Sequence, residues 1–342
     1  MNMTCMAAMA AAFAGAFALG QTAPARAAQA ESTSIALPAQ TIIFLPVYVA
    51  EDKGMWKDLG LNVTLHAITG IGSTNAMLAG SVDFAVQSGQ SLIRGNIRGR
   101  HMLGIALMAA GEAFELDARK QSFAGFDPSA PLAKRMAALK GKKISVDAPN
   151  TVVEALVRYF AAKAGLNAKT DMTLVYMQPT EAIAALKSGA IDAAMNNFPW
   201  NEAAQREGAI VLASGLTDLP ELTPTIATTT TTRGDFCDSH ASICAKLVHG
   251  YVEAHKFIHA HPDEALKIAL KRMPNANLSD LQKSMPLILK TTPLVPRYQA
   301  AGFAHAQEIM VVGNMLRKDE VRTSFAGMFT NKYVDMFAPP TQ

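Results

Sequence analysis

The feature that most constrains the fold is an internal repeat, in which two stretches of the chain return about a hundred residues later in the same order. The matching stretches are "LGLNVTL" at 59–65 with "AGLNAKTDMTL" at 164–174, and "MLAGSVDFAV" at 77–86 with "LKSGAIDAAM" at 186–195. The second match aligns Gly80 with Gly189 and Asp83 with Asp192. Because each match stands at the same step of an alternating series of strands and helices, we expect two similar α/β lobes.

Hydrophobic patterning and turn residues divide the chain into two such series. The strands expected in the first series lie at 41–45, 61–68, 82–86 and 103–109. Those expected in the second series lie at 142–148, 171–177, 190–196 and 209–214. A further strand is expected at 225–232, "TIATTTTT", and helical patterns dominate from there to the C-terminus. This order predicts mostly parallel sheets, with the C-terminal helices completing the first lobe.

The first thirty residues have the pattern of a secretory signal peptide. An apolar run at 7–19 is too short to span a bilayer, and small residues provide alternative cleavage sites after Ala27 and Ala30. The pattern departs from the usual one in that no Lys or Arg precedes the apolar run. We expect residues 1–30 to be removed and the mature protein to be soluble and exported.

The overall charge argues against one class of partner. The formal net charge is +3 over 342 residues, and the Lys and Arg residues are not gathered into a stripe. Proteins that bind nucleic acid depend on a concentrated positive surface. We therefore expect no nucleic-acid partner.

Two cysteines, Cys237 and Cys244 in "DFCDSHASIC", remain after the expected signal peptide. On one continuous helix, seven positions separate two Cα atoms by roughly 10 Å, which is too far for a disulfide. If Cys237 instead lies in a loop that folds back on the helix with Cys244, a disulfide can form. The sequence leaves both alternatives open, and this pair alone does not indicate a metal site.

Four segments, taken in order, resemble one known family. They are "LPVYVAEDKGMWKDLGLNVTLHAITGIGSTNAMLAGSVDFAV", "ALKGKKISV", "AIAALKSGAIDAAMNNFPW" and "HKFIHAHPDEAL". The chain resembles the periplasmic solute-binding proteins of the sulfonate, nitrate and thiamine-precursor ABC-uptake family, the NMT1/THI5-like proteins. In that family the first helix commonly reads P-x-Y-V-A-x-x-x-G, and a Gly-x-[Val/Ile]-Asp-x-[Ala/Gly] step recurs in both lobes. The ordered set of segments carries the resemblance, which covers nearly the whole mature chain.

The resemblance implies a periplasmic-binding-protein type II fold, in which two crossing strands join the lobes. The chain is expected to leave lobe one near 110–125, so lobe one is assigned 31–118 and 222–342 and lobe two 119–221. The resemblance also implies a periplasmic receptor that closes on a sulfonate, a carboxylate or a nitrogen heterocycle. Its partners would be this small-molecule ligand and the permease subunits of an ABC importer in the inner membrane. Such a receptor is expected to act as a monomer, without a cofactor.

Ligands of open α/β sheets bind beyond the carboxyl ends of the strands, where helix N-termini present free N–H groups. The six loops expected at these ends lie at 44–48, 70–74, 87–90, 148–151, 178–180 and 196–200. The residues expected to contact the ligand are Phe44, Pro46, Tyr48, Gly72, Ser73, Thr74, Gln87, Ser88, Asn150, Thr151, Asn197, Phe198 and Trp200, with Glu112 and Thr180 as further candidates.

The loop "GIGST" at 70–74 is glycine-rich, but it does not have the pattern of a nucleotide site. It lacks the third glycine of a dinucleotide fingerprint and the Gly-Lys pair of a P-loop. Ser73 and Thr74 are good helix N-caps, and capping is compatible with contact to a ligand. We interpret this loop as one wall of a ligand cleft.

The loop "NNFPWN" at 196–201 leaves two interpretations open. Phe198 and Trp200 flank Pro199, so they either clamp a flat or partly apolar ligand or pack inward as core. Members of the family often carry an acidic residue where Phe198 stands. Since none of the six loops contains Lys or Arg, an anion would depend on N–H groups and hydroxyls. Glu112, near the expected crossing, could instead meet a cationic or amine-bearing heterocycle.

A metal site and an enzymatic function have weaker support in the sequence than the binding of a small molecule. His255 and His259 are one helical turn apart and His261 follows, but no acidic or Cys ligand completes a zinc set. The alternative function is an enzyme on the same fold, as in a related fungal family that makes the thiamine pyrimidine with a cysteine-rich iron motif. This sequence lacks that motif. We expect no metal and no catalytic residue.

Overall fold

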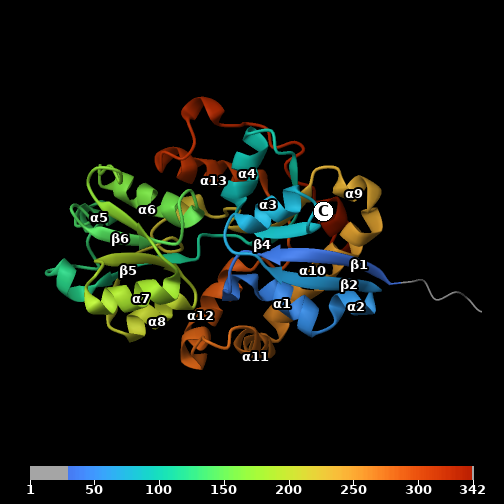
Figure 1. Ribbon diagram of the computed structural model, residues 1–342, viewed down its shortest axis with the longest axis horizontal. Coiled ribbons are helices and arrows are strands. Elements are labelled where there is room, and N and C mark those ends of the chain that lie inside the picture. The colour runs from blue at the N-terminus through green and yellow to red at the C-terminus, as the bar shows by residue number, and fades with distance from the viewer. Residues whose placement is uncertain (1–29, 341–342) are drawn as a thin grey trace, which may run out of the picture.

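Two five-stranded sheets, one in each lobe, form the framework of the protein (Figure 1). The computed structural model describes residues 30–340. The first sheet, in the order β2-β1-β3-β10-β4, contains β1 (Glu31–Leu37), β2 (Leu61–Ala67), β3 (Phe84–Gln87), β4 (Met102–Ala109) and β10 (Thr228–Arg233). The second sheet, in the order β7-β6-β8-β5-β9, contains β5 (Phe114–Arg119), β6 (Lys143–Val146), β7 (Thr173–Tyr176), β8 (Ala193–Asn197) and β9 (Ala209–Ser214).

Each sheet contains one strand that runs against the other four. β10 pairs antiparallel with β3 and β4, and β5 pairs antiparallel with β8 and β9. The other pairs, β1 with β2 and β3 and β6 with β7 and β8, are parallel. The reversed strand holds the fourth place in both sheets, so the two lobes share one topology. The predicted architecture of two similar lobes with mostly parallel sheets is confirmed.

The repeated glycines end equivalent helices. Gly80 follows α3 (Gly72–Leu78) and Gly189 follows α7 (Pro179–Ser188). Their φ angles are +77° and +80°, a left-handed conformation that glycine adopts without a Cβ penalty. Each glycine therefore turns the chain from a helix toward the next strand.

The repeated aspartates then fix the strand that follows. The Asp83 carboxylate accepts hydrogen bonds from the Thr33 hydroxyl (2.9 Å) and from Ser34 N (3.1 Å) in β1. The Asp192 carboxylate accepts one from Lys143 N (2.9 Å) at the start of β6. Each aspartate thus joins the start of one strand to its neighbour, which explains in structural terms why the motif occurs twice.

The chain crosses between the lobes twice, from β4 to β5 and from β9 to β10. Gly111, in the first crossing, has a φ of +118°. Gly215, in the second, lies so close to the first that an added Cβ would be 2.4 Å from the carbonyl oxygen of Glu112. Only glycine fits there, so the two crossing segments are held against each other.

The predicted first boundary, at 118/119, lies too late in the chain. β5 already belongs to the second sheet, where Phe114 pairs with Asn197. The segment "FELDAR" alternates apolar and charged residues, a strand signal that the sequence analysis did not use. We propose that lobe one gives way to lobe two at 110–113 and that the chain returns at 215–227.

Helices cover both sheets. Between β1 and β9, besides α3 and α7, they are α1 (Leu45–Asp52), α2 (Met55–Asp58), α4 (Gly89–Ile97), α5 (Leu132–Ala137), α6 (Val152–Lys163) and α8 (Trp200–Arg206). After β10 they are α9 (Phe236–Ser239), α10 (Ala241–Ala260), α11 (Pro262–Arg272), α12 (Leu278–Thr291), α13 (Ala300–Val312) and α14 (Lys332–Phe337). One stripe of α10, which includes Leu247, Tyr251, His255 and Ile258, is buried in lobe one.

The C-terminal helices contact both lobes. On α13, Phe303 and Met310 lie in a core cluster of lobe one, whereas Ile309 lies in the core of lobe two. On α12, the buried Asp280 accepts a hydrogen bond from Arg206 Nη2 of α8 (3.0 Å). The lobes are therefore linked on two sides in addition to the crossing segments.

The N-terminal part of lobe one differs from the prediction. The strand expected at 41–45 is absent, because Ile42–Phe44 form a 3₁₀ turn that leads into α1. The Thr41 hydroxyl oxygen caps this turn by accepting a hydrogen bond from Ile43 N (3.3 Å). The actual first strand is β1, which pairs with β2 and β3 inside the sheet.

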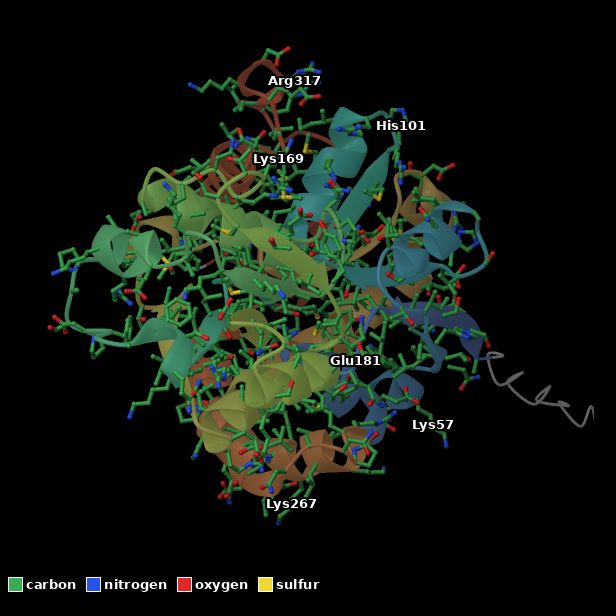
Figure 2. All side chains as sticks on the ribbon, turned by 60° about the vertical axis from the view of Figure 1, so that its left-hand side comes forward. Lys57, His101, Lys169, Glu181, Lys267 and Arg317 are labelled. Carbon is green, nitrogen blue, oxygen red and sulfur yellow. A yellow bond between two sulfur atoms is a disulfide. The ribbon has the colours of Figure 1, made fainter. Side chains whose placement is uncertain are left out.

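Charged side chains are dispersed over the outside of the molecule. Lys57, Lys169, Lys267 and Arg317 are exposed. Lys57, Lys267 and Arg317 lie at three different edges of the molecule in Figure 2. The predicted signal peptide at 1–30 lies almost entirely outside the described residues. Within residues 30–340, no helix has both the length and the apolar character needed to cross a membrane.

Cys237 and Cys244 form a disulfide. Cys237 lies in α9 and Cys244 in the first turn of α10, and the backbone leaves the helical conformation at His240 between them (φ −125°, ψ 42°). This break brings the two Cα atoms to 5.8 Å, within the usual range for a disulfide. Of the two alternatives, the folded-back geometry is the correct one.

Replacing both cysteines, as Cys237→Ala with Cys244→Ala, is expected to lower the free energy of unfolding by about 2 kcal/mol, because the bridge no longer restricts the unfolded chain. Urea unfolding followed by circular dichroism measures the difference. Reductant should shift the wild-type midpoint to that of the double variant and leave the variant unchanged. Equal midpoints for the oxidised wild type and the variant would contradict this contribution.

Candidate functional site

A cleft between the lobes is lined by residues that follow the carboxyl ends of strands in both sheets. Its first part is a cavity of about 360 Å³. The chain segments that line it are 38–44, 70–74, 87–94 and 227–228 from lobe one, and Phe114, 147–153 and Asn197 from lobe two. A second part, of about 440 Å³, shares Asp147 and Asn197 with the first and reaches 178–180 and Trp200. We refer to both parts together as the interlobe cleft.

Each of the six predicted loops contributes to this cleft. Of the predicted ligand-contacting residues, those that line its first part are Phe44, Ser73, Thr74, Gln87, Ser88, Asn150, Thr151 and Asn197. Those that line its second part are Asn197, Thr180 and Trp200. Contact between these side chains and a ligand stays a prediction.

Three of the predicted residues lie in helices and do not line the cleft. Pro46 and Tyr48 are buried in α1, whose side chains pack into the core of lobe one. Gly72 lies in the first turn of α3, where an added Cβ would be 3.2 Å from Ile68 Cγ2. Loop boundaries placed from the sequence extended a few residues into these helices.

The two aromatic residues around Pro199 take different positions. Phe198 is fully buried in the core of lobe one, although its chain segment follows a strand of lobe two. Its carbonyl oxygen accepts a hydrogen bond from the Thr41 hydroxyl (2.9 Å). Trp200 is partly buried and lines the cleft. The clamp interpretation is therefore wrong for Phe198, which packs as core and fastens this loop to lobe one.

The hydroxyls of the "GIGST" loop are already engaged within lobe one. The Ser73 hydroxyl donates to the Gly70 carbonyl oxygen (3.0 Å), and the Thr74 hydroxyl donates to Gln87 Oε1 (2.6 Å). Gln87 Nε2 in turn donates to Thr231 Oγ1 (2.8 Å) in β10. This network orders the floor of the cleft and leaves the hydroxyl oxygens as acceptors.

Arg94 lines the cleft, although it is not among the ligand-contacting residues predicted from the sequence. It lies on the second turn of α4, three residues after Ser91, so both side chains share the helix face that borders the cavity. Its Nη2 donates to the carbonyl oxygen of Asn150 in lobe two (2.8 Å), which bridges the mouth of the cleft. Burial, with the nearby Arg98 and Arg100, lowers the pKa of Arg94. Helical periodicity continued from Ser91 would have identified it.

The facing wall carries Asp147, one residue before a predicted loop. Its Oδ1 accepts hydrogen bonds from the Thr151 hydroxyl (2.5 Å) and from Ala148 N (2.8 Å). Burial raises the pKa of this carboxyl, and the bond from Thr151 opposes the rise. Asn150, which precedes Thr151 in this loop, has a φ of +62°, and its backbone N–H donates to Glu154 Oε2 (2.5 Å). The loop is therefore held by its own contacts, with Asp147 facing the cavity.

Glu112 does not line the cleft, contrary to the prediction. It is 2% exposed, at the point where the crossing segments touch, and its Oε1 accepts a hydrogen bond from Gln90 Nε2 (3.0 Å). Its Oε2 has no hydrogen-bond partner among the described residues. Burial raises the pKa of Glu112 to about 7. The residue belongs to the hinge region, not to the ligand-facing surface.

Two of the three histidines considered for zinc, His255 and His259, contact backbone oxygens instead. His255 Nδ1 lies 2.5 Å from the Pro293 carbonyl oxygen, and burial lowers the pKa of His255 to about 4. His259 Nε2 lies 2.8 Å from the Thr292 carbonyl oxygen. In the described part of the chain, no group of three or more His, Cys, Asp and Glu residues is placed to hold a metal ion.

Similar structures identify the class of fold. A protein of Bordetella bronchiseptica RB50 superposes with a TM-score of 0.77 at 24% identity, over 90% of this chain and 96% of that one. The alkanesulfonate-binding protein SsuA of Xanthomonas axonopodis pv. citri, bound to MOPS, gives 0.70 at 17% identity, over 89% and 99%. A desulfurization enzyme, DSZB, gives 0.65 at 14% identity, over 90% and 98%. The fold is the two-lobed fold of periplasmic binding proteins, as predicted.

The family model described as NMT1/THI5 like matches residues 42–265. The chain belongs to the NMT1/THI5-like family. It is also 31% identical, over 180 residues and 50% of its length, to the nitrate import ATP-binding protein NrtC of Synechococcus elongatus. The chain spans 27% of that relative.

Substituting Glu112→Gln is expected to change how stability depends on pH. The native state holds the Glu112 proton up to about pH 7, whereas the unfolded chain releases it near the ordinary pKa of about 4.3. The unfolded state thus binds fewer protons across this window, so wild-type stability falls as the pH rises. Relative to the wild type, the variant should gain up to about 3 kcal/mol between pH 4.5 and pH 8.

Urea unfolding at a series of pH values measures this effect. Glu253→Gln, at an exposed position of α10, is a matched control that should follow the wild-type profile. Parallel profiles for the wild type and Glu112→Gln would show that the carboxyl is not buried as described.

Proposed function

We propose that this protein is an extracytoplasmic solute receptor that closes its two lobes on a small molecule and delivers it to an ABC importer. The observation that carries the proposal is the interlobe cleft, which is lined by loops at corresponding strand ends of both sheets. A ligand that contacts both walls binds the closed form better than the open form and shifts the population toward it. Family membership and the fold shared with SsuA support this function.

The chemical nature of the lining favours binding over catalysis. Among the described residues, neither part of the cleft is lined by Cys or His, and the two bonded cysteines lie elsewhere in lobe one. A catalytic Cys–His pair is therefore not assembled there. The desulfurization enzyme of similar fold shows that this architecture can also support a reaction, so recovery of unchanged ligand is part of the test.

The proposed setting is the periplasm, reached through the N-terminal signal sequence. We propose that the receptor acts as a monomer and docks on the permease subunits of its importer in the inner membrane. The candidate ligands are sulfonates, carboxylates and nitrogen heterocycles. No cofactor is part of the proposed function.

The first experiment is a thermal-shift screen of the purified protein against alkyl and aryl sulfonates, nitrate, aromatic carboxylates and aminopyrimidines. A ligand present at about 100 times its Kd contributes about 2.7 kcal/mol, so the correct class should raise the melting temperature by several degrees. Small-angle scattering should show a more compact molecule with that ligand, and the ligand should be recovered unchanged. The proposal fails if no class shifts the melting temperature, or if the bound compound is converted.

Ligand-dependent fluorescence should arise from Trp200. The chain has two tryptophans, and Trp56 is fully buried in lobe one, where its Nε1 donates to the Leu247 carbonyl oxygen (3.0 Å). The Trp200→Phe variant should lose the fluorescence change that accompanies binding while keeping the thermal shift. Trp56→Phe is the matched control and should keep the change. An unaltered signal in Trp200→Phe would place the ligand away from the second part of the cleft.

A further inference from the structure

The interlobe cleft contains one cationic and one anionic side chain, on opposite walls. Arg94 of lobe one and Asp147 of lobe two are the charged residues that line its first part, and the second part adds no other charge among the described residues. Within the described part of the chain, these two side chains form no ion pair with each other, and Arg94 forms none with any other carboxylate. Each wall therefore presents an unmatched charge to a ligand.

Arg94 has donor capacity to spare. A guanidinium carries five N–H donors in a planar fork, and Arg94 places one of them on the Asn150 carbonyl oxygen. The negative charge of Glu154 favours the charged form of Arg94, but this carboxylate is already bound by Arg158 (2.5 Å) and by Asn150 N. Arg98 and Arg100 add further positive charge nearby. An anionic group of the ligand would complete the coordination of Arg94.

The opposite wall presents acceptors. An ionised carboxylate has about four lone-pair sites, and the Thr151 hydroxyl and Ala148 N occupy only one oxygen of Asp147. Asn197, which lines both parts of the cleft, has an Oδ1 that is buried without a hydrogen-bond partner among the described residues. A buried acceptor without a partner costs free energy that a donor can recover. A protonated amine of the ligand would satisfy both groups.

Apolar side chains from both lobes also line the first part of the cleft. Phe44 and Ile71 border it from lobe one, and Phe114 and Val153 border it from lobe two. The first part, at about 360 Å³, lies within the size range of small-molecule sites. These apolar side chains would bury a short hydrocarbon segment of a ligand that joins its two polar ends.

We propose that the cleft selects amino-substituted organic anions, with the anionic group on Arg94 and the amino group on Asp147 and Asn197. This inference rests on the proposed function and narrows its ligand class. It requires both charges in one molecule, so a simple anion or a simple amine would satisfy only one wall.

Matched pairs of compounds test the inference. Calorimetry compares propanesulfonate with 3-aminopropanesulfonate and butyrate with 4-aminobutyrate, extended to shorter and longer members of each series. The wild-type protein should bind the amino member of the best pair at least about 10-fold more tightly, since a charged hydrogen bond is gained. It should also discriminate against the corresponding simple amines.

Two variants separate the two ends of the site. Arg94→Gln should weaken both members of a pair by about 10-fold or more and leave their ratio unchanged, and Arg94→Lys should weaken them less. Asp147→Asn keeps an oxygen acceptor for Thr151 and Ala148 but removes the charge, so the ratio should fall toward one. Its affinity for the member without the amine should change less than about threefold.

Remote substitutions of the same kind serve as controls. Arg317→Gln lies at an exposed position after α13, outside the cleft lining, and Asp127→Asn lies on an exposed loop of lobe two. Both should bind like the wild type within about twofold. A second readout is pH, because protonation of Asp147 on acidification should reduce the amino preference of the wild type and leave Asp147→Asn unaffected.

The outcomes distinguish the two proposals. If no compound of any class binds the wild type, the proposed function fails. If the protein binds small molecules but prefers those without an amine, or if Asp147→Asn keeps the wild-type ratio, the receptor function stands and this inference is overturned. If Arg94→Gln and the wild type bind the anionic compounds with equal affinity, Arg94 does not hold the anionic group and this inference is likewise overturned.

Discussion

The double crossing of the chain is the constraint on which the rest of the structure depends. Since the chain leaves lobe one after β4 and returns at β10, each sheet accommodates one reversed strand, and the remaining strands point their carboxyl ends toward the cleft. The absence of a side chain at Gly215 allows the two crossing segments to pack at Glu112. The position of the cleft therefore follows from topology, and side chains determine what it holds.

The lobes are not two bodies joined only by a flexible link. Phe198 of the second lobe is buried in the core of the first, and Arg206 binds the buried Asp280 of α12. The hydrogen bond from Arg94 to the Asn150 carbonyl oxygen adds a polar link across the cleft mouth. Any closing motion has to preserve the apolar contacts, so we expect relative movement to concentrate at the polar link and the crossing segments.

The similarity of the two lobes could be predicted from the sequence because the same short motif occurs in both. In each copy a glycine, Gly80 or Gly189, ends a helix, and an aspartate, Asp83 or Asp192, precedes a strand. The first strand was placed at "TIIFL" because this segment has the composition of a strand. In the structure the Thr41 cap makes it the entry to a helix, and the first strand is β1. Composition could not decide that Phe198 points inward and Trp200 outward, since the backbone after β8 sets their directions. Arg94 was not predicted because the expected loop at 87–90 ends one helical turn before it.

The residues that define the architecture and those that face the ligand occupy opposite edges of the sheets. Asp83 and Asp192 act where strands begin, whereas Asp147 and Asn197 lie where strands end. Substitutions at one edge need not disturb the hydrogen bonds at the other. Such a division allows the residues that line the cleft to change while the hydrogen bonds that set the start of each strand are kept.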